Sequence, residues 1–307
     1  MGRSAHWAKL AERGSYWGLA LTFTIYRVLG RAIARLLLFP ITIWFFITGT
    51  KARRASHDYL NRIHRAGALA EPPTVIDAFR HFYSFAETAL DKVEAWTGRI
   101  AAERIDFPNQ YELEQLARSG RGALFITAHL GNIELARAIG TNAGWKKINA
   151  IVYTEHAQKF NSLLNKMHPQ SALKLIHISS FGVDTAISLK EKIDAGEWVF
   201  IVGDRTPVSS SGRVVMANFL GSPAPFAIGP YMLAHLMACK VYLIFCVRKK
   251  ERFHIYLEPF AEKIELPSRT RQAAIEKWAA LYAERLAYYT MKTPYQWFNF
   301  YNYWGRN

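Results

Sequence analysis

Short apolar runs alternate with longer segments in which apolar residues recur every three or four positions. The runs indicate buried strands, and the recurrence indicates helices packed on one face. The predicted strands are residues 123–127, 148–153, 173–178, 198–202, 241–247 and 253–257. The predicted helices are residues 75–93, 133–139, 157–167, 183–193, 227–237 and 270–291. This alternation predicts an α/β fold with a central, mostly parallel sheet flanked by helices. His81 lies beside the apolar face of the first helix, and we interpret it as a solvated rim residue.

Residues 15–50 are the most apolar part of the chain, but three arginines interrupt them. Arg27, Arg31 and Arg35 are four residues apart, so on a helix they form one basic stripe opposite an apolar face. Pro40 predicts a break in that helix. The uninterrupted apolar run, residues 36–47, is shorter than the roughly 20 residues that a membrane-spanning helix needs.

Three interpretations of this segment are open. It is a helical pair lying in or dipping into an anionic leaflet with its arginines on lipid phosphates, a buried core hairpin, or one tilted span starting near residue 17. We favour the first because a protein core would have to bury the arginine stripe. We therefore expect residues 1–55 to anchor the chain to a membrane and residues 56–307 to form the α/β domain.

The charge balance points to an anionic partner. The chain has 39 Lys and Arg residues against 24 Asp and Glu residues, a net charge of +15. Nucleic acid, an anionic membrane and an acidic protein all fit that charge. Because no nucleic-acid-binding fingerprint occurs, we do not expect nucleic acid as a partner. Cys239 and Cys246 are not spaced as metal ligands, so we expect no metal.

The most informative stretch follows the predicted strand 123–127. His129 comes first, then the breaker pair Gly131-Asn132, with Asn132 as a plausible helix cap. A strand–turn–helix corner brings Glu134 back toward His129, where a carboxylate orients an imidazole and stabilises its cation. His129 is therefore a candidate general base. Taken alone, the pair fits a structural surface pair better than a catalytic one.

Two further stretches are candidates for binding. Gly203-Asp204-Arg205 follows the predicted strand 198–202, so Arg205 can clamp a phosphate or carboxylate with Asp204 holding it in place. The alternative is an Asp–Arg pair that only joins a loop. Residues 218–230 are apolar but broken by Gly and Pro, and we interpret them as a hydrophobic loop that lines a channel or as a connection packed in the core.

Four motifs in sequence order carry a family resemblance. They are His129-x4-Glu134, Gly203-Asp204-Arg205, Phe219-Leu220-Gly221 with Pro223, and Pro294-Tyr-Gln-Trp-Phe298. Together they resemble the lysophospholipid acyltransferase superfamily, in particular its lipid A late acyltransferase (lauroyl and myristoyl transferase) branch. The resemblance covers most of the chain. Residues 7–15 and 296–304 look closer to predicted acyltransferases encoded beside aryl polyene lipid genes in Gram-negative bacteria.

The resemblance implies acyl transfer from an acyl carrier protein thioester, or a coenzyme A thioester, to a hydroxyl of a lipid acceptor. The reaction would take place at the cytoplasmic face of the bacterial inner membrane, without a cofactor. His129 would deprotonate the acceptor and Glu134 would orient His129. Arg205 would hold an anionic group, and the loop with Phe219 and Gly221 would border the acyl chain. We add that the amides of Gly131 and Asn132 are expected to stabilise the oxyanion.

The chain departs from the lipid A branch at two places. Tyr153-Thr154 stands where that branch has an Arg, and residues 299–304 replace basic residues after the terminal Trp motif. Fewer cations suit an acceptor with fewer phosphates than a lipid A precursor. Two other functions stay open: a lipid hydrolase or thioesterase using the same histidine, and a non-catalytic basic protein that binds membranes.

Overall fold

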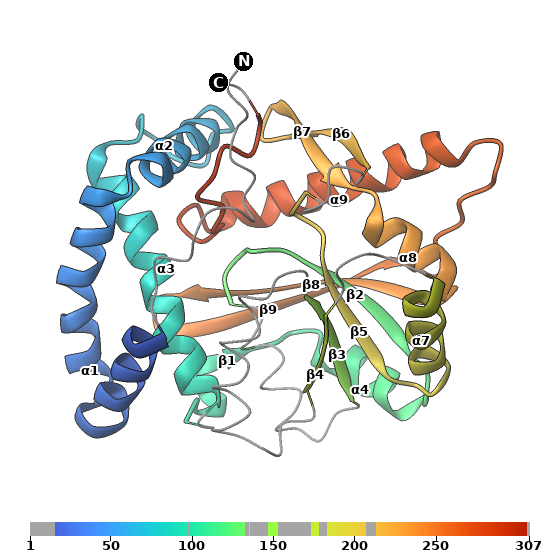
Figure 1. The fold of residues 1–307 in the computed structure, drawn as a ribbon, viewed down its shortest axis with the longest axis horizontal. Helices are drawn as coiled ribbons and strands as arrows, with labels where there is room; N and C mark the ends of the chain where they lie inside the picture. The colour runs from blue at the N-terminus through green and yellow to red at the C-terminus, as the bar shows by residue number, and fades with distance from the viewer. Residues whose placement is uncertain are drawn as a thin grey trace.

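The computed structural model describes residues 16–96, 99–132, 135, 147–152, 173–177, 183–206 and 213–305. Within them, seven strands form one sheet in the order β1-β9-β8-β2-β5-β3-β4 (Figure 1). Their bounds are β1 (Ile105–Asp106), β2 (Ala123–Thr127), β3 (Ile148–Val152), β4 (Leu173–His177), β5 (Trp198–Val202), β8 (Lys240–Lys249) and β9 (Arg252–Ala261). Every pairing is parallel except that of β8 with β9, which confirms the predicted mostly parallel sheet.

The strand β2 lies in the middle of the sheet, between β8 and β5. All five of its residues are buried. A parallel strand covered by helices on both faces reads as a continuous apolar run rather than an alternating one, which is why its bounds were predictable from the sequence. The bounds of β5 were predicted for the same reason.

Helices cover both faces of the sheet. The described helices are α1 (Tyr16–Thr48), α2 (Thr50–Arg65), α3 (Val75–Trp96), α4 (Gln110–Arg118), α7 (Val183–Asp194), α8 (Gly229–Met237) and α9 (Arg271–Lys292), with a 3₁₀ turn at Ala102–Arg104. Residues of α2, α7, α8 and α9 pack in one core cluster, and residues of α4 pack in the cluster on the opposite face. The predicted helix 157–167 lies outside the described residues, as does most of 133–139.

The break in α1 lies at Gly30, not at the predicted Pro40. Gly30 has φ 80° and ψ 179°, a conformation that glycine adopts without steric cost, whereas the helix continues through Pro40. Proline removes the hydrogen bond to the carbonyl of residue 36. Leu36 is 72% exposed, so this turn of the helix has an open side.

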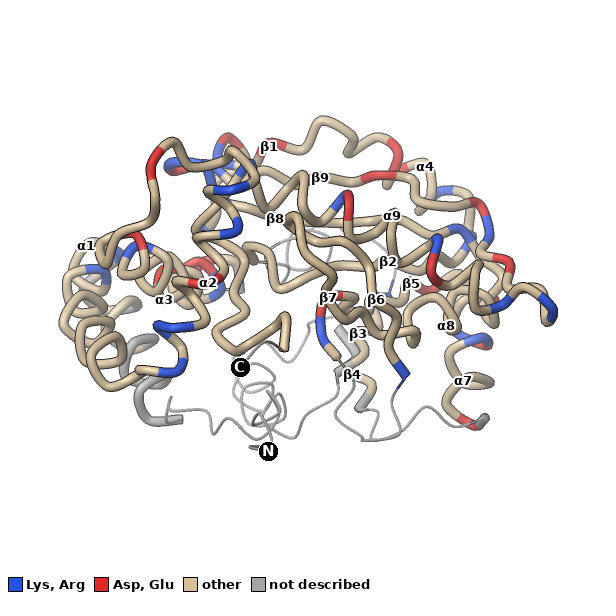
Figure 2. The backbone as a smooth tube through the Cα atoms, turned by 90° about the horizontal axis from the view of Figure 1, so that it is seen from above, with Lys and Arg blue, Asp and Glu red and all other residues tan. Residues whose placement is uncertain are grey.

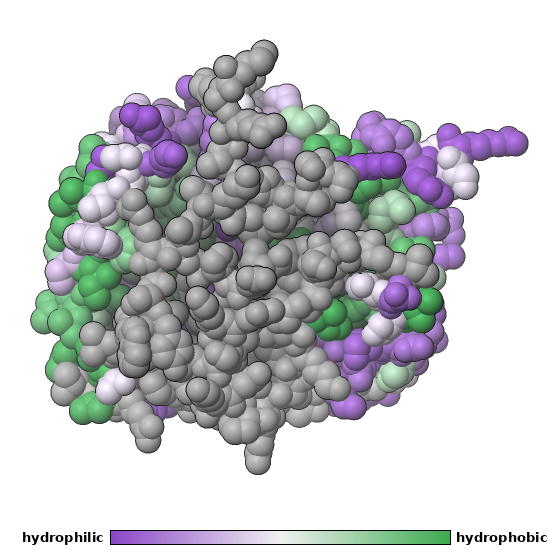
Figure 3. All heavy atoms as spheres, in the orientation of Figure 1, coloured by the Kyte–Doolittle hydropathy of each residue, from purple (hydrophilic) through white to green (hydrophobic). Residues whose placement is uncertain are grey.

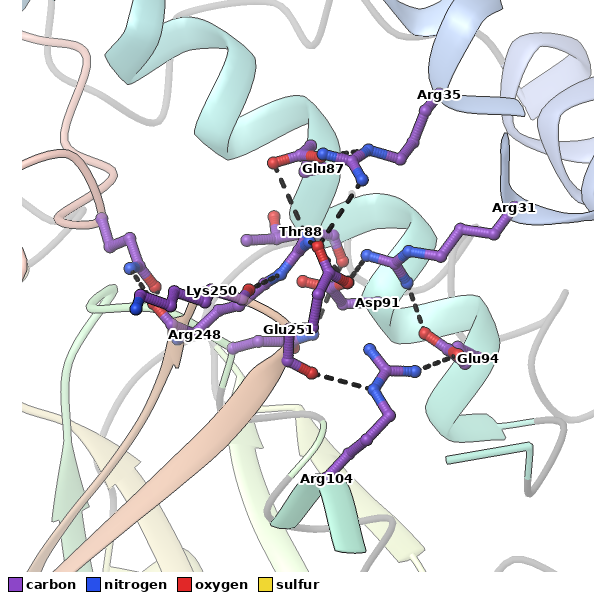
Figure 4. Close-up of polar contacts among 12 residues, drawn as sticks. Arg31, Arg35, Glu87, Thr88, Asp91, Glu94, Arg104, Arg248, Lys250 and Glu251 are labelled. Carbon is purple, nitrogen blue, oxygen red and sulfur yellow. Dashed lines mark hydrogen bonds and ion pairs between the residues drawn. The ribbon is translucent and has the colours of Figure 1, made fainter. Parts of the chain in front are cut away.

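The arginines of α1 are paired with acidic residues rather than left for lipid phosphates. Arg31 forms ion pairs with Asp91 and Glu94 on α3, and Arg35 contacts Glu87 at 2.7 Å (Figure 4). The argument that a protein core cannot accommodate this stripe was therefore wrong for Arg31 and Arg35, because α3 supplies the opposite charges. The side chain of Arg27 lies outside the described residues.

The opposite face of α1 is apolar and exposed. Residues Gly30–Thr48 are long and apolar enough to cross a membrane, by length and composition alone. The exposed side chains are Val28, Ile33, Leu36, Leu37, Phe39, Ile41, Ile43, Trp44 and Ile47. They contribute to the apolar surface at the left of Figure 3. Lys and Arg residues, by contrast, lie on most of the described elements, interspersed with acidic residues (Figure 2). The helix α2 runs through the expected domain boundary at residues 55–56.

Residues 214–227 form a β-hairpin, so most of residues 218–230, expected to be a hydrophobic loop or a connection packed in the core, belong to paired strands and their turn. The strands β6 (Val214–Phe219) and β7 (Ser222–Ala227) pair antiparallel. Leu220 and Gly221 both have positive φ, 50° and 76°, as the tight turn of a two-residue hairpin requires. Pro223 and Pro225 misled the sequence interpretation: proline is excluded from central strands but tolerated where a strand has a free edge.

Candidate active site

His129 stands two residues beyond the carboxyl end of β2, as the sequence predicted. Its backbone carbonyl accepts a 2.8 Å hydrogen bond from the amide of Phe298, and Leu130 forms a β-bridge with Trp297. The imidazole is 35% exposed. The chain on both sides of His129 is thus held by the carboxyl-terminal segment, while the ring keeps an open side.

Asp204 meets His129 because of the register between β2 and β5. Thr127 pairs with Val202, so residues two positions beyond each strand end lie together. The carboxylate of Asp204 accepts hydrogen bonds from the backbone amide of His129 at 2.9 Å and from its Nδ1 at 2.8 Å. The sequence suggested that Asp204 would hold Arg205 in place. The carboxylate is instead buried and directed at His129.

Two more donors satisfy this buried carboxylate. The Nε1 of Trp297 donates to it at 2.8 Å and the Nδ2 of Asn299 at 3.1 Å. Burial alone raises the pKa of Asp204, but His129, Arg205 and the hydrogen bonds outweigh burial and hold that pKa below its usual range. Asp204 is therefore an anion at neutral pH.

The imidazole of His129 is neutral and has a defined tautomer. Burial lowers the pKa of His129 and the Arg205 guanidinium lowers it further, against the opposing effect of Asp204. The Nε of Arg205 lies 3.3 Å from Nδ1, but Nδ1 cannot accept that proton while it donates its own to the carboxylate. We assign the proton to Nδ1 from this network, which leaves the lone pair on Nε2.

Arg205 lies beside His129. Its guanidinium is 5.2 Å from the ring of Tyr301, and its Nη2 donates to the carbonyl of Phe298 at 3.5 Å. The structure therefore brings together His129, Asp204 and Arg205 from the predicted set. Glu134 lies outside the described residues, so its expected approach to His129 stays a prediction.

The backbone amides of Gly131 and Asn132 are already occupied. The first donates to the carbonyl of Gln296 at 2.8 Å and the second to the carbonyl of Cys246 at 2.7 Å. The expectation that these amides point into the cleft was wrong, and an oxyanion must take its donors elsewhere. The side chain of Asn132 is buried and directed at the carbonyl of Thr88, at 3.5 Å.

Phe219 and Gly221 lie in the hairpin, away from an open channel. Phe219 is fully buried, with its ring 5.1 Å from Trp297 and 5.7 Å from Trp304. The core-packing interpretation of this segment fits the geometry better than the channel interpretation. A contact of Phe219 or Gly221 with an acyl chain stays a prediction.

Three residues near the base were missed or misjudged. His81, interpreted as a solvated rim residue, is fully buried between α2 and the carboxyl-terminal segment. Trp297 and Asn299 fell inside recognised stretches of sequence but were given no role. The helical pattern of residues 75–93 shows one apolar face and cannot reveal that α2 covers the neighbouring side as well.

A polar cavity of about 300 Å³ lies beside the site. Figure 4 shows its charged residues converging from α1, α3, the end of β8 and the turn between β8 and β9. Its lining consists of Arg35, Ser84, Glu87, Asp91, Arg248, Lys250, Glu251 and Gln296. Three basic and three acidic residues line it, so it suits neither an acyl chain nor a simple anion.

The fold and site define an α/β protein with a candidate catalytic histidine at the carboxyl end of a central parallel strand, where such folds place their active sites. The chain belongs to the bacterial lipid A biosynthesis acyltransferase family, whose model matches residues 1–306. It is accordingly an acyltransferase of lipid biosynthesis, and members of this family are membrane-associated. No curated protein matches the chain.

Proposed function

We propose that this protein transfers an acyl chain from an acyl carrier protein thioester to a hydroxyl of a lipid acceptor, with His129 as general base. The observation that carries the proposal is the hydrogen bond from Nδ1 of His129 to the buried Asp204, which leaves Nε2 free to accept a proton. The family supplies the reaction class. Coenzyme A thioesters are the alternative donors.

The chemistry follows from this arrangement. Nε2 of His129 takes the proton of the acceptor hydroxyl while its oxygen attacks the thioester carbonyl. Asp204 stabilises the imidazolium that forms, as would Glu134 if it approaches the ring. The tetrahedral intermediate collapses to an ester, the carbon–sulfur bond breaks, and the leaving thiolate takes the proton from His129. The acceptor oxygen is itself the nucleophile, so no covalent enzyme intermediate is needed.

Arg205 is the candidate to bind an anionic group of the donor or acceptor. Its guanidinium is close enough to His129 to share a substrate with it, at 3.3 Å from the ring. The net charge of +15 suits an acidic carrier protein. Phe219 and Gly221, which border the acyl chain in this proposal, complete the substrate-binding set.

The acceptor is proposed to carry fewer phosphates than a lipid A precursor. Tyr153 and Thr154, which lack the charge of the family's arginine, lie outside the described residues. Asn299 stands where related enzymes carry basic residues, and its side chain is directed at Asp204 rather than outward. Together with the resemblance of residues 7–15 and 296–304, this supports an aryl polyene-type acyl chain or acceptor.

We place the protein at the cytoplasmic face of the bacterial inner membrane, with α1 lying along the leaflet. The ring of Phe39 packs against Phe79 at 5.5 Å, and Phe46 packs against Phe82 at 5.2 Å, so α3 covers one side of α1 for much of its length. A helix packed this way cannot be surrounded by lipid without losing those contacts. Its exposed apolar side suits one leaflet, and the exposed Lys51 and Arg54 beyond it suit anionic headgroups.

Hydrolysis is the second candidate function. The imidazole of His129 is 35% exposed, so water can reach the base that would otherwise deprotonate the acceptor. A thioesterase would use the same histidine and carboxylate without a lipid hydroxyl.

One assay separates these functions. Detergent-solubilised protein is incubated with a radiolabelled acyl carrier protein thioester and total membrane lipid of the native host. Labelled lipid is the expected product and identifies the acceptor. Free fatty acid alone would instead establish the hydrolase. Folded protein that turns over neither carrier protein nor coenzyme A thioesters would contradict both enzymatic functions and favour the non-catalytic membrane-binding protein.

A further inference from the structure

The segment of residues 294–299, here called the terminal strap, contacts His129, the loop that follows it and Asp204. Its backbone binds the carbonyl of His129 through the amide of Phe298, at 2.8 Å. The carbonyl of Gln296 accepts the amide of Gly131, also at 2.8 Å. Two of its side chains, Trp297 and Asn299, donate to Asp204. The strap therefore fixes both the loop that carries His129 and the carboxylate that faces it.

The strap is itself held from the other side by α2 and α3. Nε2 of His81 lies 2.9 Å from the carbonyl of Trp297, and Nδ1 lies 2.9 Å from the hydroxyl of Ser56. A carbonyl only accepts, so Nε2 carries the proton and Nδ1 accepts from the serine. The hydroxyl of Tyr59 donates to the carbonyl of Pro294 at 2.6 Å. Two hydrogen bonds from buried side chains thus anchor the strap.

We propose that Trp297 and Asn299 are positioning residues for His129, acting through Asp204, and that His81 holds Trp297 in place for this role. The proposal rests on the proposed function of His129 as the base. In sequence order the participants are far apart, but the hydrogen bonds join them into one chain from α2 and α3 to the base.

The physical effect is to fix a buried anion. A carboxylate that loses one of its donors is held less firmly in line with Nδ1, so the orientation and tautomer of His129 are less well defined. The indole N–H of Trp297 and the amide of Asn299 occupy lone pairs of Asp204 and hold it in line with Nδ1. They also draw charge from the carboxylate, so it raises the basicity of His129 less than a carboxylate with fewer donors would.

The matched test compares Trp297→Phe with Trp304→Phe. Both changes remove an indole N–H from the same aromatic cluster, but Nε1 of Trp304 donates to the carbonyl of Phe219, at 3.4 Å, and not to Asp204. Loss of a hydrogen bond to a charged group corresponds to a roughly 10- to 100-fold fall in kcat for Trp297→Phe, with KM within about twofold. The acid limb of the pH profile of kcat/KM for Trp297→Phe should shift to higher pH. Trp304→Phe should leave kcat and this pH profile unchanged.

His81 is tested by conservative rescue. His81→Gln keeps an N–H donor that can reach the carbonyl of Trp297, whereas His81→Leu has none. We expect His81→Gln to keep most of the activity and His81→Leu to reproduce the kcat loss of Trp297→Phe. Equal loss in both variants would remove His81 from the proposal.

A titration that needs no turnover keeps the inference testable if the proposed reaction fails. Nitrogen NMR of histidine-labelled protein reports the pKa and tautomer of His129, assigned by the signal that His129→Gln removes. We expect Trp297→Phe to raise the pKa of His129 relative to wild type and Trp304→Phe. If Trp297→Phe does not fold, Asn299→Leu is measured in the same way. An unchanged pKa and tautomer in the folded variant would overturn the inference, whatever the enzyme turns out to transfer.

Discussion

His129 donates a hydrogen bond from Nδ1 to Oδ1 of Asp204 at 2.8 Å, although 75 residues separate them in sequence. The two residues follow neighbouring parallel strands, and the register between those strands brings them together. Sheet topology thus supplies the candidate base with a carboxylate that the local His129-x4-Glu134 motif does not include. Asp204 therefore becomes the first residue to test after His129.

Asp204→Asn removes the charge that faces the imidazole while keeping the side-chain size. The amide can present its N–H to Nδ1, which favours the wrong tautomer and takes the lone pair away from Nε2. We expect kcat to fall by roughly 10²- to 10⁴-fold in steady-state acyl transfer. Asp194→Asn, which alters an exposed carboxylate on α7, is the control and should keep its activity. Activity of Asp204→Asn within tenfold of wild type would argue against this role.

The buried His81 should make the protein less stable in mild acid. Burial lowers the pKa of His81 to about 4, from 6.5 in an unfolded chain. Between these values the unfolded state binds the extra proton, so stability is complete above about pH 6.5 and is lost as the pH falls toward 4. The contribution lost is about 3 kcal/mol in full below pH 4, of which about 2 kcal/mol is lost by pH 5. Urea unfolding of wild type and His81→Gln at pH 7.5 and pH 5 measures it. The difference between the two pH values should shrink in the variant, and an equal difference would count against a buried neutral imidazole.

Gly131→Ala should disrupt the corner that carries His129. Gly131 has φ +68°, and a Cβ there would lie 2.0 Å from the carbonyl oxygen of Cys246. The backbone strain and the clash together cost about 3 kcal/mol or more. Gly305→Ala, at φ +66° with no atom within 4 Å of the added Cβ, isolates the cost of the backbone conformation. Thermal unfolding should separate the two variants clearly, and equal losses would mean that the corner relaxes.

The ion pairs between α1 and α3 should contribute to stability only as a complete set. Asp91 is 1% exposed and contacts Arg31 and Arg248 (Figure 4). Arg31→Met leaves Asp91 and Glu94 without one of their cations, which costs about 3–5 kcal/mol for a buried pair. Arg80→Met removes an exposed partner of Asp77 and should cost less than about 1 kcal/mol. Denaturant unfolding of both variants checks this; similar costs would show that solvent screens the cluster.

The sequence predicted best where burial is simplest. The bounds of β2 and β5 were predictable because a central parallel strand is apolar on both faces and reads as one short continuous apolar run. The position of His129 followed directly, since the strand end fixes it. Asp204 and Arg205 were recognised as site residues, but their orientation depends on strand pairing that no local pattern encodes.

The errors share a physical cause. Proline at residue 40 reads as a break, yet the helix absorbs it and bends at Gly30, where φ is positive. Arg31 looked incompatible with a packed helix because its acidic partners are about 60 residues away, on α3. His81 looked solvated because only the second helix packed against it makes it buried. Each depends on contacts between elements distant in sequence, which hydrophobic periodicity does not report.

The most direct test of the central claim is the rate of lipid labelling by His129→Ala beside wild type, with the same radiolabelled carrier protein thioester and host lipid. His57→Ala, at an exposed histidine of α2, serves as the matched control. With all three proteins folded, general-base catalysis predicts a fall of roughly 10²- to 10⁴-fold for His129→Ala alone. Labelling by His129→Ala within tenfold of wild type would contradict the assignment of His129 as the base.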